Sequence, residues 1–336
     1  MARRARKPAW AKAFERGFAA LTRNSLRASL PPSLGTGLKS PFLKSKPPPG
    51  EGDWLAGVAI GSSGARRYRL YRPPDVLFGE RLPLVVMLHG CGQDANTFAL
   101  STRMNRLAAR ERFMVLYPEQ DRLANGQGCW NWFDSRSGRA AGEAQLIMTA
   151  IDQVCLLYRA DRSRVAVAGL SAGASMAALL VGRHPERFKA LVMHSGVAPG
   201  AAHSTPTALA AMRGRRAAGP LVPVTPTDAA AWPPLMVIHG AGDRVVAASN
   251  GRDAVKIWAD AVGARPVAAR AVQRGKRYAM SVTDFKAGGR TVATLVEVER
   301  LAHAWSGGAA SQSYGDVQGP DATRLAWAFM GRYFAA

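Results

Sequence analysis

The 336-residue sequence predicts an α/β fold in which a mostly parallel sheet is covered by helices on both faces. Two observations predict this class. Short, continuously apolar runs such as Leu82–Leu88 and Leu235–His239, typical of strands buried on both faces, alternate with segments of helical periodicity such as 142–158. Several of these runs also end in glycine-bearing loops, which in such sheets gather beyond the carboxyl ends of the strands. We therefore expect those loops to converge on one site.

The elements follow in order along the chain. Apolar and polar residues alternate over 66–72, as they do in a half-buried strand, and a Pro-Pro pair ends this pattern. Later apolar runs add further strands to the sheet. A Pro- and Ala-rich insertion at 197–234 separates the last of these from the others. The expected strands are 66–72, 82–88, 113–117, 165–170, 190–194 and 235–239, with β-type segments near 267–272, 278–285 and 291–299. The expected helices are 97–112, 142–158, one directly after residue 171, 205–216, 249–261 and one from about 321.

Composition narrows the class of protein. Hydrophobic residues make up 48% of the chain, but no stretch approaches the ~18 unbroken apolar residues of a membrane span, so we expect a protein that does not span a membrane. Lys and Arg number 45 against 23 Asp and Glu, a net charge of +22. This charge permits binding to nucleic acid or an anionic surface without requiring it, and we expect no specific nucleic-acid partner.

The chain is organised around a strand, turn and helix at residues 165–180. The pattern Gly169-Leu-Ser171-Ala-Gly173 joins an apolar run to an Ala- and Leu-rich helical stretch. A strand that turns abruptly into a helix at a serine needs small neighbours, which Gly169, Ala172 and Gly173 provide. We expect Ser171 at the edge of the sheet with its hydroxyl as a nucleophile. The alternative is an ordinary turn in which the serine caps the helix.

A serine nucleophile needs a base that takes its proton and an acid that orients the base. Five of the six histidines fit structural positions, at strand ends, before proline or in the insertion: His89, His184, His194, His203 and His239. His303 lies late in the chain in a glycine-containing loop after a strand, and we expect it to be the base. Asp243 follows a buried strand in a glycine-bearing turn and is the expected acid. The chain order Ser, Asp, His is that of α/β-hydrolases.

An oxyanion formed at this serine needs two hydrogen-bond donors. The amide of Ala172 is one, and the amide of Cys91, in the loop after an early strand, is the expected second. Because Cys91 and Cys129 both lie in loops at the same end of the sheet, we expect a disulfide between them; the alternative is two buried free thiols. Cys155 falls on the core side of its helix and is interpreted as packing. No zinc-type spacing exists, and we expect neither a metal nor a cofactor.

Several motifs together give the chain a family resemblance. They are His89-Gly-Cys-Gly-Gln93, Thr102-Arg-Met-Asn105, Tyr117-Pro-Glu-Gln120, Cys129-Trp-Asn-Trp-Phe133, Gly169-Leu-Ser-Ala-Gly173, His194-Ser-Gly196 and Ala302-His-Ala-Trp-Ser-Gly-Gly308. Over about residues 54–335 the chain resembles the polyhydroxybutyrate depolymerase family of esterases in its single-domain form. The resemblance implies an α/β-hydrolase fold, a serine esterase, and aromatic side chains beside the site that hold a polyester. By position these would be Trp130, Trp132 and Trp305.

The resemblance also sets the expected substrate. We expect hydrolysis of short-chain polyhydroxyalkanoate oligomers or amorphous polyester through an acyl-enzyme, because no polymer-binding module follows the matched region. A carboxylesterase of feruloyl or acetyl-xylan type is the alternative, since that group has similar loops. An alternative from another class is a basic binding protein on a degenerate hydrolase fold.

The amino-terminal region has a different composition from the rest. Residues 1–50 hold eleven Lys or Arg and one acid, and we expect an extension with a Pro-rich linker, disordered in part, before a single catalytic domain at 54–336. In 8–28, apolar residues fall at helical spacing between basic ones, a pattern open to three interpretations: a solvated tail, adhesion to an anionic or polymer surface, or a targeting segment. The resemblance favours export, yet no export signal is recognisable, so the cytoplasm remains the other expectation.

Overall fold

The computed structural model describes residues 48, 50–215 and 232–335. The chain divides into two units, Met1–Lys46 and Pro47–Ala336, and all the described residues belong to the second. The expected basic helix at 8–28 and its linker lie outside the described residues. No helix in the described part of the chain combines the length and apolar character that crossing a membrane requires.

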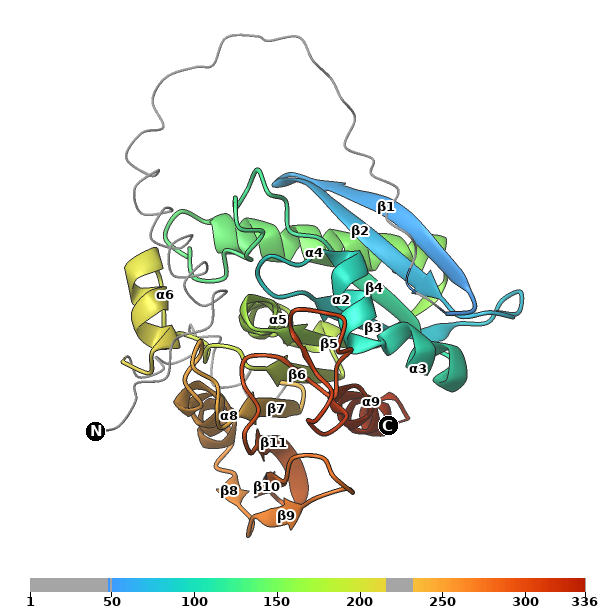
Figure 1. The fold of residues 1–336 in the computed structure, drawn as a ribbon. Helices are drawn as coiled ribbons and strands as arrows, with labels where there is room; N and C mark the ends of the chain where they lie inside the picture. The colour runs from blue at the N-terminus through green and yellow to red at the C-terminus, as the bar shows by residue number, and fades with distance from the viewer. Residues whose placement is uncertain (1–47, 49, 216–231, 336) are drawn as a thin grey trace. The chain divides into compact units, whose positions relative to one another are not determined.

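One large sheet organises the described residues (Figure 1). Its eleven strands follow the order β1-β2-β4-β3-β5-β6-β7-β11-β10-β8, and β9 pairs with β10 beside this path. Their bounds are β1 Asp53–Gly61, β2 Gly64–Arg72, β3 Leu82–Leu88, β4 Met114–Pro118, β5 Ala160–Leu170, β6 Ala190–His194, β7 Leu235–Gly240, β8 Arg265–Pro266, β9 Arg270–Val272, β10 Met280–Ala287 and β11 Arg290–Val298. The run from β4 to β11 is parallel, and the pairs at both ends are antiparallel.

Helices cover both faces of this sheet. Helices α4 (Arg139–Leu157), α5 (Ala172–Arg183) and α8 (Ser249–Ala261) contribute to one core cluster. Helices α2 (Ala95–Thr102), α3 (Met104–Glu111) and α9 (Ala322–Phe334) contribute to the other. The described part also contains α6 (Thr205–Met212), the short 3₁₀ helix η1 (Pro185–Arg187) and the paired short strands β12 (Trp305–Ser306) and β13 (Gly315–Asp316). This arrangement confirms the predicted α/β architecture.

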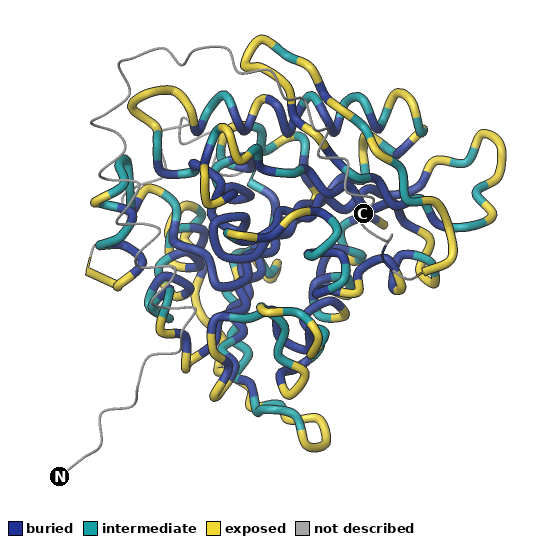
Figure 2. The backbone as a smooth tube through the Cα atoms, turned by 45° about the horizontal axis from the view of Figure 1, so that its top comes forward, coloured by how far each residue is buried: buried dark blue, intermediate teal, exposed yellow. Residues whose placement is uncertain are grey.

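The two cores explain the continuous apolar runs in the sequence. Alternate side chains of a strand point to opposite faces, so a strand with helices on both sides needs apolar residues at every position. In β3, Leu84, Val86 and Leu88 face one cluster, whereas Val85 and Met87 face the other. All seven residues of this strand are buried. Figure 2 shows the same burial through the centre of the molecule.

Several elements differ from the sequence prediction, among them the helix expected at 97–112, strand β1 and helix α6. The single helix expected at 97–112 is two helices, because Arg103 between them adopts a left-handed conformation with φ 55°. Its guanidinium donates a 2.6 Å hydrogen bond to the carbonyl oxygen of Gly307, which favours the break. Strand β1 was not predicted. It is an edge strand in which Ala59 is buried but Val58 and Ile60 are exposed, so its apolar residues show no clear alternation. Helix α6 ends at Met212, before the predicted 216.

Candidate active site

Ser171 lies at the sharp turn between β5 and α5. Its backbone has φ 56° and ψ −121°, a strained conformation for a residue with a side chain, and its amide donates a 2.8 Å hydrogen bond to the carbonyl oxygen of His194. The turn requires glycine on both sides. A Cβ on Gly169 would lie 2.4 Å from the Gly173 carbonyl, and one on Gly173 would lie 2.1 Å from the Leu88 carbonyl oxygen. These close backbone approaches hold the hydroxyl at the carboxyl edge of the sheet.

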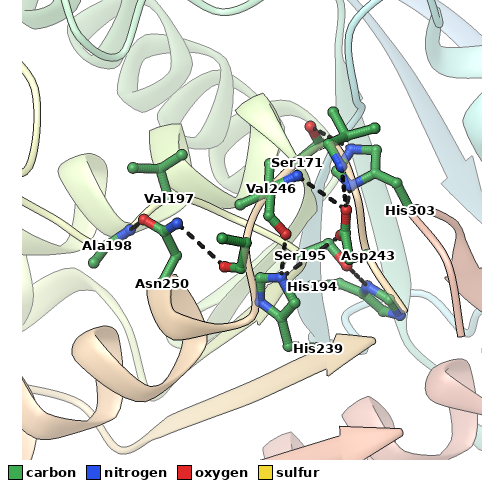
Figure 3. Close-up of polar contacts among 12 residues, drawn as sticks. Ser171, His194, Ser195, Val197, Ala198, His239, Asp243, Val246, Asn250 and His303 are labelled. Carbon is green, nitrogen blue, oxygen red and sulfur yellow. Dashed lines mark hydrogen bonds and ion pairs between the residues drawn. The ribbon is translucent and has the colours of Figure 1, made fainter. Parts of the chain in front are cut away.

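His303 reaches Ser171 from the loop after β11 (Figure 3). Its Nε2 lies 2.8 Å from the Ser171 Oγ, and its Nδ1 lies 2.7 Å from the Asp243 Oδ2. A carboxylate accepts, so Nδ1 carries the proton and Nε2 is free to accept from the serine hydroxyl. The imidazole is therefore in the tautomer that a general base needs.

Asp243 occupies the turn that follows β7. Its Oδ1 accepts 2.9 Å hydrogen bonds from the amides of Val245 and Val246, which leaves Oδ2 to His303. Burial opposes ionisation of this carboxyl, but the charges and hydrogen bonds of His303, the nearby His239 and the Val246 amide outweigh it, so the pKa of Asp243 is lowered. The group is an ionised acceptor at neutral pH.

The loop after β3 carries the expected oxyanion donor. Its amides at Gly90, Gly92 and Gln93 donate to acceptors within the protein: the Gln93 Oε1, the Gln127 carbonyl and the Gly90 carbonyl. The Cys91 amide has no such acceptor among the described residues. The Ala172 amide opens helix α5, where the first amides have no partner within the helix. Neither predicted donor therefore has a competing acceptor in the part of the chain that the structure describes.

Gln93 helps to shape the loop after β3, a role that the sequence prediction did not assign to it. Its side chain is buried and its Oε1 accepts a 3.0 Å hydrogen bond from the Gly90 amide, which closes the loop around Cys91. Its place at the end of the His89–Gln93 motif was the available signal. A polar side chain in a glycine-rich turn can equally well point into solvent. The motif alone therefore did not predict that Gln93 would bond the Gly90 amide.

A disulfide joins Cys91 and Cys129. It attaches the tryptophan-bearing loop at 118–138 to the loop after β3, which carries the predicted oxyanion donor. Behind that loop, the buried Glu143 carboxylate accepts hydrogen bonds from the Gln120 side chain at 2.7 Å and from the Asn131 amide and side chain at 2.9 and 2.6 Å. Cys155, by contrast, is a free thiol on α4. Gln120 and Asn131, which belong to two of the sequence motifs, therefore attach the loop at 118–138 to Glu143 of α4.

The three tryptophans expected to contact substrate lie in different surroundings. Trp130 and Trp305 have no exposed surface, and both donate from Nε1 to the protein, to the His89 carbonyl and the Thr323 hydroxyl respectively, at 3.0 Å. Side chains that are buried and hydrogen-bonded in this way cannot contact a polymer substrate. The expectation that Trp130 and Trp305 bind the polyester was therefore wrong. Trp132 is partly exposed and stacks edge-on against Phe133. It is the one of the three that can reach a ligand.

The fold and this site together define the class of protein. A mostly parallel sheet with a serine at the bend after its central strand, and an Asp and a His from later loops, is the architecture of the α/β-hydrolases. An acetyl xylan esterase from Aspergillus awamori has the same fold: its structure aligns with a TM-score of 0.59 at 21% identity, covering 75% of this chain and 94% of that one. A second neighbour, an S-formylglutathione hydrolase from Agrobacterium tumefaciens, aligns with a TM-score of 0.51 at 18% identity over 75% of this chain and 89% of its own.

Within this class, the family is defined by sequence. Residues 66–271, more than half of the chain, match the esterase PHB depolymerase family, and the chain belongs to that family. It is 33% identical over 190 residues to poly(3-hydroxyalkanoate) depolymerase C of Paucimonas lemoignei, a match that covers 52% of this chain and 44% of the relative. It is 31% identical over 223 residues to feruloyl esterase B of Neurospora crassa, covering 62% of this chain and 75% of the relative. The match thus spans less than half the length of the Paucimonas enzyme.

Proposed function

We propose that this protein is a serine esterase that hydrolyses carboxylic esters through an acyl-enzyme. The observation that carries the proposal is the unbroken line of hydrogen bonds from the Ser171 hydroxyl through His303 to Asp243, at 2.8 and 2.7 Å. Hydrogen bonding of this kind makes a serine hydroxyl a nucleophile at neutral pH. Family membership supports the same conclusion.

The residues fit an ordered reaction. The Ser171 Oγ attacks the ester carbonyl carbon while its proton passes to the His303 Nε2, and the resulting oxyanion accepts from the amides of Cys91 and Ala172. The intermediate then expels the alcohol, which takes the proton from His303. A water molecule, deprotonated by His303, attacks the acyl-enzyme and releases the acid with Ser171 restored. Asp243 orients His303 and stabilises its charged form throughout.

For the substrate we propose esters of short-chain hydroxyalkanoates, as oligomers or amorphous polyester. The family and the Paucimonas relative support this class. The similarity to a feruloyl esterase supports the alternative, a carboxylesterase acting on feruloyl or acetyl-xylan esters. A panel of hydroxybutyrate oligomers, feruloyl esters and acetylated sugars separates the two: turnover of only the last two classes would refute the polyester substrate and leave the esterase proposal standing.

We further propose that residues 54–336 act as a single catalytic domain and that residues 8–28 attach it to an anionic or polymer surface. The support is the basic amphipathic pattern of 8–28 and the proline-rich composition that follows. Deletion of residues 1–48 should leave turnover of a soluble ester unchanged and weaken sedimentation with polyester granules or anionic vesicles. Unchanged sedimentation would refute the surface role.

The esterase itself is tested with a short-chain p-nitrophenyl ester. Replacing Ser171 with Ala should lower kcat by about 10⁴-fold or more, because the nucleophile is removed while the site remains. Ser62→Ala, in the exposed turn between β1 and β2, is the matched control and should retain full activity. Equal rates for the wild type and Ser171→Ala would favour a basic binding protein on a degenerate hydrolase fold.

A further inference from the structure

Two buried imidazoles from neighbouring strands flank the Asp243–His303 pair (Figure 3). His194 ends β6 and His239 lies near the end of β7, and both side chains have no exposed surface. Burial lowers the pKa of both, that of His194 to about 3. They are therefore neutral at the pH at which an esterase of this kind works, and each must be in one particular tautomer.

The tautomer of His194 follows from its partners. Its Nε2 accepts a 3.1 Å hydrogen bond from the Ser306 amide, so the proton is on Nδ1, which lies 3.1 Å from the Ser195 hydroxyl. The ring also stacks on Trp305, with centroids 5.0 Å apart. His194 thus contacts Trp305 and Ser306, which directly follow the loop that carries His303.

His239 has the opposite tautomer. Its Nε2 lies 3.0 Å from the Val246 carbonyl oxygen, which can only accept, so Nε2 carries the proton. The same nitrogen lies 3.6 Å from the Asp243 Oδ2, and Nδ1 has no hydrogen-bond partner among the described residues. Gly251 of α8 packs against Nδ1, and a Cβ on Gly251 would lie 3.0 Å from this nitrogen.

These contacts connect His239 to the carboxylate in two ways. Val246 accepts from His239 through its carbonyl and donates to the Asp243 Oδ1 through its amide, so one residue transmits the position of the ring to the acid. The His239 Nε2 also lies 3.6 Å from Oδ2, the oxygen that bonds His303, so the ring packs directly against the carboxylate.

We propose that His239, as the neutral Nε2–H tautomer, is a positioning residue that holds the turn 243–246 and thereby keeps the Asp243 carboxylate aligned with His303. The proposal rests on the proposed esterase function. The charged and titratable groups that face His239 are Asp243, His303, His194 and Glu297 of β11, the last paired with Arg252 at 2.8 Å. None of these groups is placed to donate a hydrogen bond to the Val246 carbonyl in place of His239.

The test compares two replacements of the same ring. His239→Gln keeps an N–H at nearly the position of Nε2, whereas His239→Leu fills similar volume without a donor. With a p-nitrophenyl ester, His239→Leu should lower kcat roughly 10- to 100-fold with little change in KM, less than the about 10⁴-fold that follows complete loss of the acid's function. His239→Gln should recover most of this loss. Equal losses in both variants, or a loss confined to KM, would overturn the proposal.

A pH profile separates positioning from simple stability. A misaligned carboxylate stabilises the His303 imidazolium less, so the acid limb of kcat/KM should move to lower pH in His239→Leu and stay in place in His239→Gln. If His239→Leu does not fold, Gly251→Ala serves instead, because its Cβ displaces the ring without removing the donor. It should shift the limb in the same direction, and an unmoved limb in a folded variant would contradict the proposal.

A measurement without substrate keeps this inference separate from the esterase proposal. In ¹⁵N-histidine-labelled protein, NMR should show His239 as the neutral Nε2–H form at pH 8. An inactive wild type with this spectrum would refute the esterase and support the positioning role. A wild type in which His239 is the Nδ1–H form would refute the positioning role alone.

Discussion

The indole nitrogen of Trp130 donates a 3.0 Å hydrogen bond to the carbonyl oxygen of His89. The disulfide between Cys91 and Cys129 lies close to this contact in the chain, two residues after His89 and one residue before Trp130. Together with the bond from the Gly92 amide to the Gln127 carbonyl, these contacts attach the loop at 118–138 to the loop that carries the Cys91 amide. Trp130, which the family resemblance would assign to substrate contact, instead helps to fix the loop that carries the predicted oxyanion donor.

The first prediction concerns this disulfide. The double variant Cys91→Ser, Cys129→Ser should lower the free energy of unfolding by about 3–4 kcal/mol, since the bond closes a loop with a sequence separation of 38 residues. Urea unfolding with and without a reducing agent measures the change. Cys155→Ala, at the free thiol, is the control and should change stability by less than about 1 kcal/mol. Insensitivity of the wild type to reduction would contradict the prediction.

The second prediction concerns the bend at the nucleophile. Gly173→Ala should destabilise the protein by about 3 kcal/mol or more and abolish ester turnover, because its Cβ would lie 2.1 Å from a backbone oxygen of β3 that cannot move aside. Gly126→Ala is the matched control, since a Cβ there meets open space. Soluble yield, urea unfolding and turnover report the outcome. A stable, active Gly173→Ala protein would show that the bend tolerates a side chain.

The third prediction concerns stability in acid. Burial lowers the pKa of His89 to about 4 and that of His194 to about 3 from an ordinary 6.5. Between these values and 6.5 the unfolded chain binds more protons than the folded one, so stability should fall as pH decreases below about 6.5 and stay level above pH 7.5. Each group contributes at most about 1.4 kcal/mol per pH unit.

Urea unfolding at pH 8, 7, 6 and 5 measures this slope before most carboxylates titrate. His194→Gln should remove part of this slope, because the amide oxygen still accepts from Ser306 but does not titrate. His89, His184 and His239, whose pKa values are also lowered, account for the rest. A wild type that is equally stable at pH 5 and pH 8 would show that these imidazoles are not held neutral.

The fourth prediction separates the tryptophans. Trp132→Ala should raise KM for hydroxybutyrate oligomers roughly tenfold, with p-nitrophenyl acetate and stability little changed, because its ring is partly exposed. Trp305→Phe should instead lower stability by about 1–3 kcal/mol, since it leaves the buried Thr323 hydroxyl without its donor. Kinetics on both substrates and urea unfolding distinguish the two effects. An unchanged KM in Trp132→Ala would remove the last of the predicted aromatic contacts.

Much of the architecture was predictable because its signals are local. Apolar runs such as Leu82–Leu88 predict strands covered on both faces, and the glycines around Ser171 predict a bend too tight for larger residues. The order Ser171, Asp243, His303 followed from the position of each after a strand. In the structure these three side chains lie within hydrogen-bond distance, as the prediction required.

Other features depended on partners far along the chain. Helical periodicity continues through Arg103, yet its bond to Gly307, 204 residues away, accompanies a break between α2 and α3. The aromatic motif at 129–133 gave no sign that Trp130 would be buried and Trp132 partly exposed. Neighbouring residues in a loop have no fixed periodicity, so only packing decides which of them faces inward.

The sequence by itself determined the fold class, the family and the identity of the serine, acid and base candidates, because backbone conformation and strand burial depend mainly on nearby residues. Only the tertiary structure decided which buried polar groups meet: the two tautomers of His194 and His239, the Gln93 contact and the burial of Trp130 and Trp305. The physical reason is that a buried polar atom must find a hydrogen-bond partner, and that partner is set by the packing of distant segments.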